Sequence, residues 1–115
     1  MSPATLEGLT VIDREAGQAF EKAAKVLTEK VNEPDDAANA NNDAAKAYGK
    51  EYPEDSVRCL KLVIQQYCSR GNFRRAAREK ENMGERYESE MGDRKNAILA
   101  YTDAANWYEG DGSQA

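Results

Sequence analysis

The chain has 115 residues, enough for one small domain, and only 40% of them are apolar, with a mean hydropathy of −0.87. Its net charge of −5 argues against a nucleic-acid-binding protein. It contains no histidine, which removes the usual general base near neutral pH, and no apolar run approaches the roughly 18 residues that span a bilayer.

Helix-breaking residues divide the chain at regular intervals, at 32–34, 52–53, 71, 92 and 110. The segments between these breaks are close to 20 residues long and show the apolar spacing of helices. The sequence therefore predicts five helices, at about 13–31, 35–50, 54–70, 73–91 and 94–109. The domain boundaries that follow are a lead-in at 1–13, a helical repeat domain at 14–110 and a tail at 111–115.

The odd-numbered helices repeat at an offset of 40 residues. Phe20 aligns with Leu60 and Ala100, and Leu27 aligns with Tyr67 and Trp107. The even-numbered helices repeat at an offset of 39 residues. Ala37, Ala38 and Tyr48 of the second helix align with Ala76, Ala77 and Tyr87 of the fourth. Two helices per unit of about 40 residues predict an all-α, TPR-like α-solenoid of antiparallel hairpins. An ordinary helical bundle with coincidental spacing is the alternative.

The repeat pattern also predicts an incomplete array. The fifth helix carries an apolar face, formed by Ala104, Trp107 and Tyr108, that the pattern assigns to packing against a sixth helix. We therefore expect a fragment or truncated form, with possible weak self-association through this helix.

The sequence contains no recognisable catalytic constellation. Its glycines are isolated, so no phosphate-binding loop is predicted, and Cys59 and Cys68 have no histidine with which to form a zinc site. Nine helical residues separate the two cysteines, which places them on opposite sides and about 13 Å apart along the axis, too far for a disulfide. We expect no enzymatic activity, no cofactor and no metal.

Positive charge is concentrated in one segment. Between Arg58 and Arg86 there are eight basic and three acidic residues, which leaves −10 for the rest of the chain. The densest stretch is RGNFRRAAREK, in which Arg74 and Arg78 are four residues apart and share a helix face. Arginine binds carboxylates in pairs, so this segment is a candidate docking surface for an acidic partner. A solvated helix face with pairing inside the helix is the alternative.

Several strings resemble the α-SNAP family, the soluble adaptors of the NSF ATPase, and the fungal secretion-type members most closely. They are AGQAFEKAAKV, the stretch from DAAKAYGKEYPED through GNFRRAAREKENMGERYE, and DRKNAILAYTDAANWYEGD. No single motif is diagnostic, but their ordered succession from residue 14 to 115 is specific.

The resemblance implies an adaptor that coats the SNARE four-helix bundle (syntaxin-type) and recruits the NSF-type ATPase for SNARE disassembly, located in the cytoplasm and peripheral to membranes. In the family, a basic residue after the alanine pair contacts the SNARE bundle; it falls on Arg78, so the resemblance implies that this charge is kept. The family's basic position in the preceding turn falls on Asn72, which carries no charge, and the nearby Arg74 and Arg75 are expected to compensate for the lost charge. The implied SNARE-binding residues are Asn72, Arg74, Arg75, Arg78 and Lys80. The family's apolar membrane loop and its ATPase-contacting C-terminal region are expected to be missing.

Two other functions remain open at this level. A generic TPR-like module that binds peptide tails would place basic and asparagine residues on the odd-numbered helices, whereas here they lie mostly on the helix that starts at Phe73. A structural self-association piece is supported only by the uncovered fifth helix.

Overall fold

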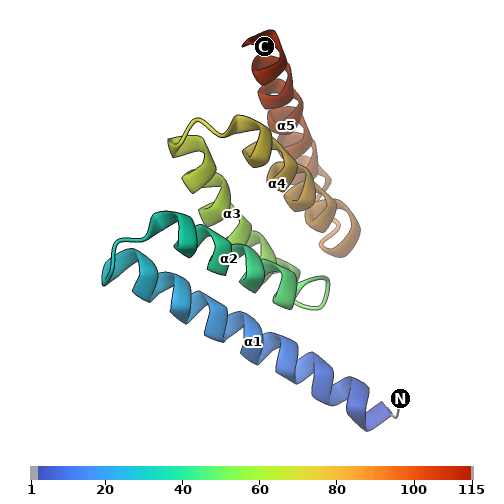
Figure 1. The fold of residues 1–115 in the computed structure, drawn as a ribbon. Helices are drawn as coiled ribbons and strands as arrows, with labels where there is room; N and C mark the ends of the chain where they lie inside the picture. The colour runs from blue at the N-terminus through green and yellow to red at the C-terminus, as the bar shows by residue number, and fades with distance from the viewer. Residues whose placement is uncertain (1–2, 115) are drawn as a thin grey trace. The chain divides into compact units, whose positions relative to one another are not determined.

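The computed structural model describes the backbone of residues 3–114 and the side chains of residues 14–110. Within this range the chain forms α1 (Pro3–Glu29), α2 (Pro34–Tyr48), α3 (Pro53–Ser69), α4 (Phe73–Glu85), a short π-helix η1 (Arg86–Glu90) and α5 (Arg94–Gln114), and the described part contains no strand (Figure 1). These elements form two compact units, Met1–Cys59 and Leu60–Ala115. The prediction of an all-α fold of helical hairpins is confirmed.

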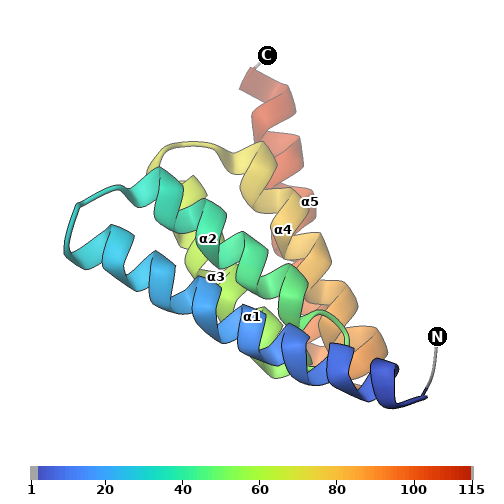
Figure 2. The same cartoon turned by 60° about the horizontal axis from the view of Figure 1, so that its bottom comes forward.

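The first unit is built around the hairpin of α1 and α2, which lie side by side and antiparallel in both views (Figures 1 and 2). Its core is made largely of alanine, because small side chains allow two helix backbones to approach closely. Five alanines are buried there: Ala24, Ala37, Ala38, Ala44 and Ala45. The connection turns at Asn32, whose positive φ of 52° suits asparagine better than most residues, and Pro34 then starts α2.

The second unit contains the hairpin of α4 and α5, which are also adjacent in both views (Figures 1 and 2). The alanine pair of α4 and the alanines of α5 at the predicted stripe positions are buried, namely Ala76, Ala77, Ala97, Ala100 and Ala104. After its last residue, Glu85, α4 continues into the wider π-helix η1, where the Met91 amide donates to the Arg86 carbonyl five residues back at 3.0 Å. Gly92 has a φ of 63°, and Asp93 then accepts the Asn96 amide at 3.1 Å as α5 starts.

The helix boundaries differ from the predicted ones mainly at the ends of the chain. Helix α1 begins at Pro3 rather than near residue 13, and α5 continues to Gln114 rather than ending near 109. Residues 4–12 contain no proline and only one isolated glycine, Gly8, and proline at the first helical position is compatible with a helix start. Gly110 lies inside α5, where an isolated glycine costs only about 1 kcal/mol relative to alanine and does not stop a helix.

The apolar face of α5, which includes Trp107 and Tyr108, has a neighbour that the repeat pattern did not predict. Both rings contact side chains of α4, as described below, and both remain half-buried, so packing of this face against a further helix stays a prediction. Among the side chains of α5 described up to residue 110, the large apolar ones that are exposed are Ile98, with 63% of its surface exposed, and Leu99, with 55%. These two residues lie outside the alanine stripe, which explains why the repeat alignment overlooked them.

Candidate functional site

The turn before α4 fixes where the predicted basic surface begins. Gly71 adopts a φ of 73°, a conformation that favours glycine, and the following Asn72 amide donates to the Tyr67 carbonyl at 2.8 Å. The Asn72 carbonyl then accepts the Ala76 amide at 3.0 Å, which starts the helix. The two residues therefore end α3 and orient α4 in one short connection.

The structure brings three of the five predicted site residues to the exposed side of α4. Arg74, Arg75 and Arg78 are exposed, and Asn72 is exposed at the preceding turn. The opposite side of the helix is anchored by Ala76 and Ala77, which are fully buried. We call Arg74, Arg75 and Arg78 the α4 arginine surface. It offers three guanidinium groups within little more than one helical turn, an arrangement suited to carboxylates on a partner.

Arg74 is held by a side chain of α5. Its guanidinium carbon lies 5.4 Å from the centre of the Tyr108 ring, within the range of a cation–π interaction. The Tyr108 hydroxyl donates to Glu81 Oε1 at 2.6 Å, and this bond raises the pKa of Tyr108, together with its partial burial. Tyr108 thus links two residues of α4 that lie seven positions apart.

Lys80 differs from the arginines because it is directed towards α5. Its ammonium group lies 3.2 Å from Asp103 Oδ2 and 5.6 Å from the centre of the Trp107 ring, and only 21% of its side chain is exposed. The other neighbour of Trp107 is Phe73, with ring centres 6.2 Å apart and planes tilted by 59°. Lys80 therefore contributes to hairpin packing as well as to the charge of the segment.

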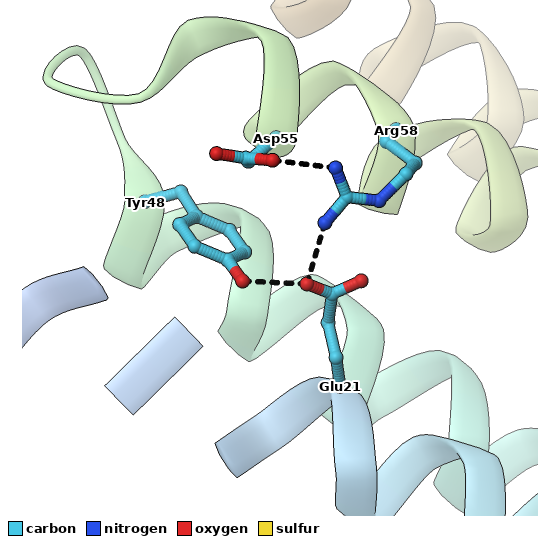
Figure 3. A network of polar contacts seen from close by, with 4 residues as sticks. All are labelled: Glu21, Tyr48, Asp55 and Arg58. Atoms are coloured by element: carbon cyan, nitrogen blue, oxygen red, sulfur yellow. Dashed lines mark hydrogen bonds and ion pairs between the residues drawn. The ribbon is translucent and has the colours of Figure 1, made fainter. Parts of the chain in front are cut away.

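A second polar cluster lies in the first unit, where Glu21 connects α1 to two other helices (Figure 3). Its Oε1 accepts the Tyr48 hydroxyl at 2.5 Å and Arg58 Nη2 at 2.7 Å, while Arg58 Nη1 donates to Asp55 Oδ1 at 2.5 Å. Burial, followed by the bond to Glu21, raises the pKa of Tyr48, and the bonds to Asp55 and Glu21 raise the pKa of Arg58. Every charge in the cluster has an opposite charge or a donor, so its role is to fasten helices together.

The two thiols have the properties of structural cysteines. Cys59 is fully buried, and burial raises its pKa to about 12, followed by the effect of the Glu21 charge. Cys68 is half-buried, and burial raises its pKa too, although the charge of Lys80 acts in the opposite direction. Thiols of raised pKa are poor nucleophiles at neutral pH because little thiolate is present.

The side chains described for residues 14–110 contain no group of three or more histidine, cysteine or carboxylate residues that could hold a metal ion. No helix in the described part of the chain is long and apolar enough to cross a bilayer.

Residues 12–115 match the family model of the soluble NSF attachment proteins, SNAP. The chain belongs to this family. It is 56% identical over 101 residues to a vesicular-fusion protein sec17 homolog of Neurospora crassa, covering 88% of this chain and 35% of that protein. It is also 43% identical over 100 residues to the vesicular-fusion protein SEC17 of Komagataella phaffii, and 35% identical over 100 residues to the human alpha-soluble NSF attachment protein. Each of these two matches covers 87% of this chain. They cover 33% of the Komagataella phaffii protein and 34% of the human protein.

The chain thus spans about a third of the length of the SNAP relatives it matches. Membership confirms the family resemblance and the TPR-like character of its helical hairpins. Sequence reasoning missed the contribution of α5 to the α4 arginine surface. The signal was available in the adjacent aromatics Trp107 and Tyr108, which the repeat pattern had assigned to a different neighbour.

Proposed function

We propose that this chain is part of a SNARE-binding adaptor and that it contacts the acidic surface of the assembled four-helix SNARE bundle through the α4 arginine surface. The observation that carries the proposal is the exposure of Arg74, Arg75 and Arg78 on one helix of a SNAP-family hairpin. Asn72 and Lys80 flank this surface, with Asn72 exposed at its N-terminal end. The names of the relatives, which are vesicular-fusion and NSF attachment proteins, support a role in membrane fusion.

The wider role follows from the same family membership. A SNAP protein on a SNARE bundle would recruit the NSF-type ATPase, and the SNAP chain itself would have no catalytic activity, need no cofactor and remain in the cytoplasm at the periphery of membranes. The absence of histidine supports the non-enzymatic part of this proposal.

The test measures binding of the chain to a fluorescently labelled, preassembled SNARE bundle by anisotropy. Arg78→Glu should weaken binding about five- to tenfold, because it converts one attraction to an acidic surface into a repulsion. Lys25→Glu is the matched control, since Lys25 is exposed on α1 and its reversal changes the net charge equally. Binding of the unchanged chain should also weaken as salt is raised, because exposed charges are screened over about 8 Å at 0.15 M.

Equal effects of the two charge reversals would remove the support for the α4 arginine surface. Isolated SNARE peptides provide the second comparison. Tighter binding to single peptides than to the assembled bundle would instead favour a generic TPR-like peptide-binding module.

Weak self-association through the fifth helix stays a prediction. We extend it from the Trp107 face to Ile98 and Leu99, which are large, apolar and exposed within the described part of α5. Sedimentation of Ile98→Ser against the unchanged chain at high concentration is the corresponding test, and identical sedimentation would contradict it.

A further inference from the structure

Tyr108 makes contacts that the proposed SNARE-binding role of the α4 arginine surface does not by itself account for. It lies on α5, yet its ring contacts Arg74 and its hydroxyl donates to Glu81, and both of these residues belong to α4. Arg78 is close enough for its positive charge to oppose the rise in the pKa of Tyr108 caused by Glu81. The ring is only half-buried, so the contact lies at the edge of the α4 arginine surface rather than inside the hairpin core.

An exposed arginine without support would sample many rotamers, and fixing it in a complex would cost conformational entropy. A guanidinium stacked on an aromatic face keeps its N–H groups available in the plane of the fork. The ring at this site cannot rotate freely, because its hydroxyl is bound to the Glu81 carboxylate at 2.6 Å. Arg74 is therefore partly preorganised before any partner arrives.

We propose that Tyr108 is a positioning residue for SNARE binding: its ring, fastened by Glu81, holds the guanidinium of Arg74 in the orientation that receives carboxylates of the acidic bundle. This inference rests on the proposed function and adds a residue of α5 to those that orient the α4 arginine surface. The partner class is the same, an acidic helical bundle, and Tyr108 contributes through Arg74 rather than by contact with the partner.

The expected effects separate the ring from its hydroxyl. Tyr108→Leu removes the stacking surface and should weaken binding to the SNARE bundle about two- to fivefold, the range of an exposed cation–π interaction. Tyr108→Phe keeps the aromatic face and should retain most of the affinity. Rescue by phenylalanine is expected only if the ring itself supports Arg74.

The decisive experiment is a double-mutant cycle by anisotropy with the labelled bundle. Tyr108→Leu is measured in the unchanged chain and in an Arg74→Ala background, where it should have no further effect. Tyr101→Leu is the matched control, because Tyr101 lies on the same helix and likewise donates to a glutamate, Glu88, at 3.0 Å. It should leave the affinity unchanged. Circular dichroism establishes that each variant is folded.

Equal weakening by Tyr108→Leu in both backgrounds would show a general structural effect and overturn the inference, as would the absence of any effect. A second measurement does not depend on binding. The NMR signal of the Arg74 Nε–H should shift when Tyr108 becomes leucine but stay near its position in Tyr108→Phe, and a signal indifferent to both changes would also overturn it.

The two proposals fail in different ways. If Arg78→Glu and Arg74→Ala both leave bundle binding unchanged, the proposed function fails and the positioning role fails with it. If those two variants weaken binding while Tyr108→Leu does not, the SNARE-binding surface stands and only the positioning role is lost.

Discussion

The two hairpins use the same arrangement of glycine, glutamate and tyrosine, but one buries it and the other leaves it near the surface. In the first unit, Gly17 and Glu21 are four residues apart on α1 and face Tyr48 of α2. A Cβ at Gly17 would lie 2.7 Å from the tyrosine ring, so the ring rests directly on the glycine backbone. Tyr48 is only 2% exposed, and its hydroxyl reaches Glu21 at 2.5 Å.

In the second unit, Gly84 and Glu88 are again four residues apart and face Tyr101 of α5. A Cβ at Gly84 would also lie 2.7 Å from the ring, and the Tyr101 hydroxyl donates to Glu88 at 3.0 Å. Here, however, the tyrosine is half-exposed and the hydrogen bond is open to water. The same three residue types should therefore contribute more stability in the first unit, because solvent competes less for the bond and the ring has no space to move.

The largest expected difference between the units is at alkaline pH. The unfolded Cys59 thiol loses its proton near pH 9, whereas burial keeps the folded thiol protonated to about pH 12. The protonated thiol therefore makes its full contribution to the free energy of unfolding below pH 9, and this contribution is lost as the pH rises from 9 to 12. Tyr48, whose pKa is also raised, adds to the loss above pH 10.

Each such group lowers the free energy of unfolding by about 1.4 kcal/mol per pH unit in its window, or roughly 3 kcal/mol for one thiol between pH 9 and 11. Urea unfolding followed by circular dichroism at pH 8, 9, 10 and 11 measures the loss. Cys59→Ala should flatten the dependence, and Cys68→Ala is the control. A pH dependence that Cys59→Ala leaves unchanged would contradict the assignment.

Glycine-to-alanine substitutions should show the next largest difference. Gly17→Ala forces a methyl group into a ring that is buried, and overpacking of this kind costs about 1–3 kcal/mol, more than the 0.5–1 kcal/mol gained in helix propensity. Gly84→Ala meets Tyr101, which can move outwards into solvent, so its net effect should lie within about 1 kcal/mol of zero.

Circular dichroism of urea unfolding compares the two glycine variants, and Trp107, the single tryptophan, reports on the second unit by fluorescence. A Gly84→Ala variant as unstable as Gly17→Ala would show that the exposure of Tyr101 provides no freedom to move.

The fold could largely be predicted from the sequence because the apolar residues that define its helices recur at regular spacing. Alanines and larger apolar residues recur at helical spacing. Of the aligned positions, Leu60 and Ala100 are buried as the pattern predicts, whereas Phe20 is 39% exposed. Proline and glycine mark the internal turns correctly. The outer ends of α1 and α5 were not predictable in the same way, since a helix can pass through an isolated glycine at modest cost.

The candidate site was readable only in part. Charge concentration and helix spacing identified Arg74 and Arg78 and their shared face, and whether they bind SNARE proteins stays a prediction. The stacking of Arg74 on Tyr108 joins residues 34 positions apart, and no local pattern encodes such a contact. Lys80 shows the converse case, because its sequence neighbours suggested an exposed cation while Asp103 and Trp107 hold it against α5.

The smallest expected difference concerns the tyrosine hydroxyls alone. Tyr48→Phe removes the donor to Glu21 from a largely buried position, where Arg58 remains as the carboxylate's other partner at 2.7 Å. The free energy of unfolding should fall by about 1 kcal/mol, the net value of one intramolecular hydrogen bond. Tyr101→Phe removes an exposed bond that water can replace, so the fall should be below about 0.5 kcal/mol. Both changes keep the ring and its packing on glycine, so the comparison isolates the hydroxyl. Urea unfolding of the two variants under identical conditions measures it, and equal losses would mean that burial of the Glu21 cluster adds nothing to the strength of its tyrosine bond.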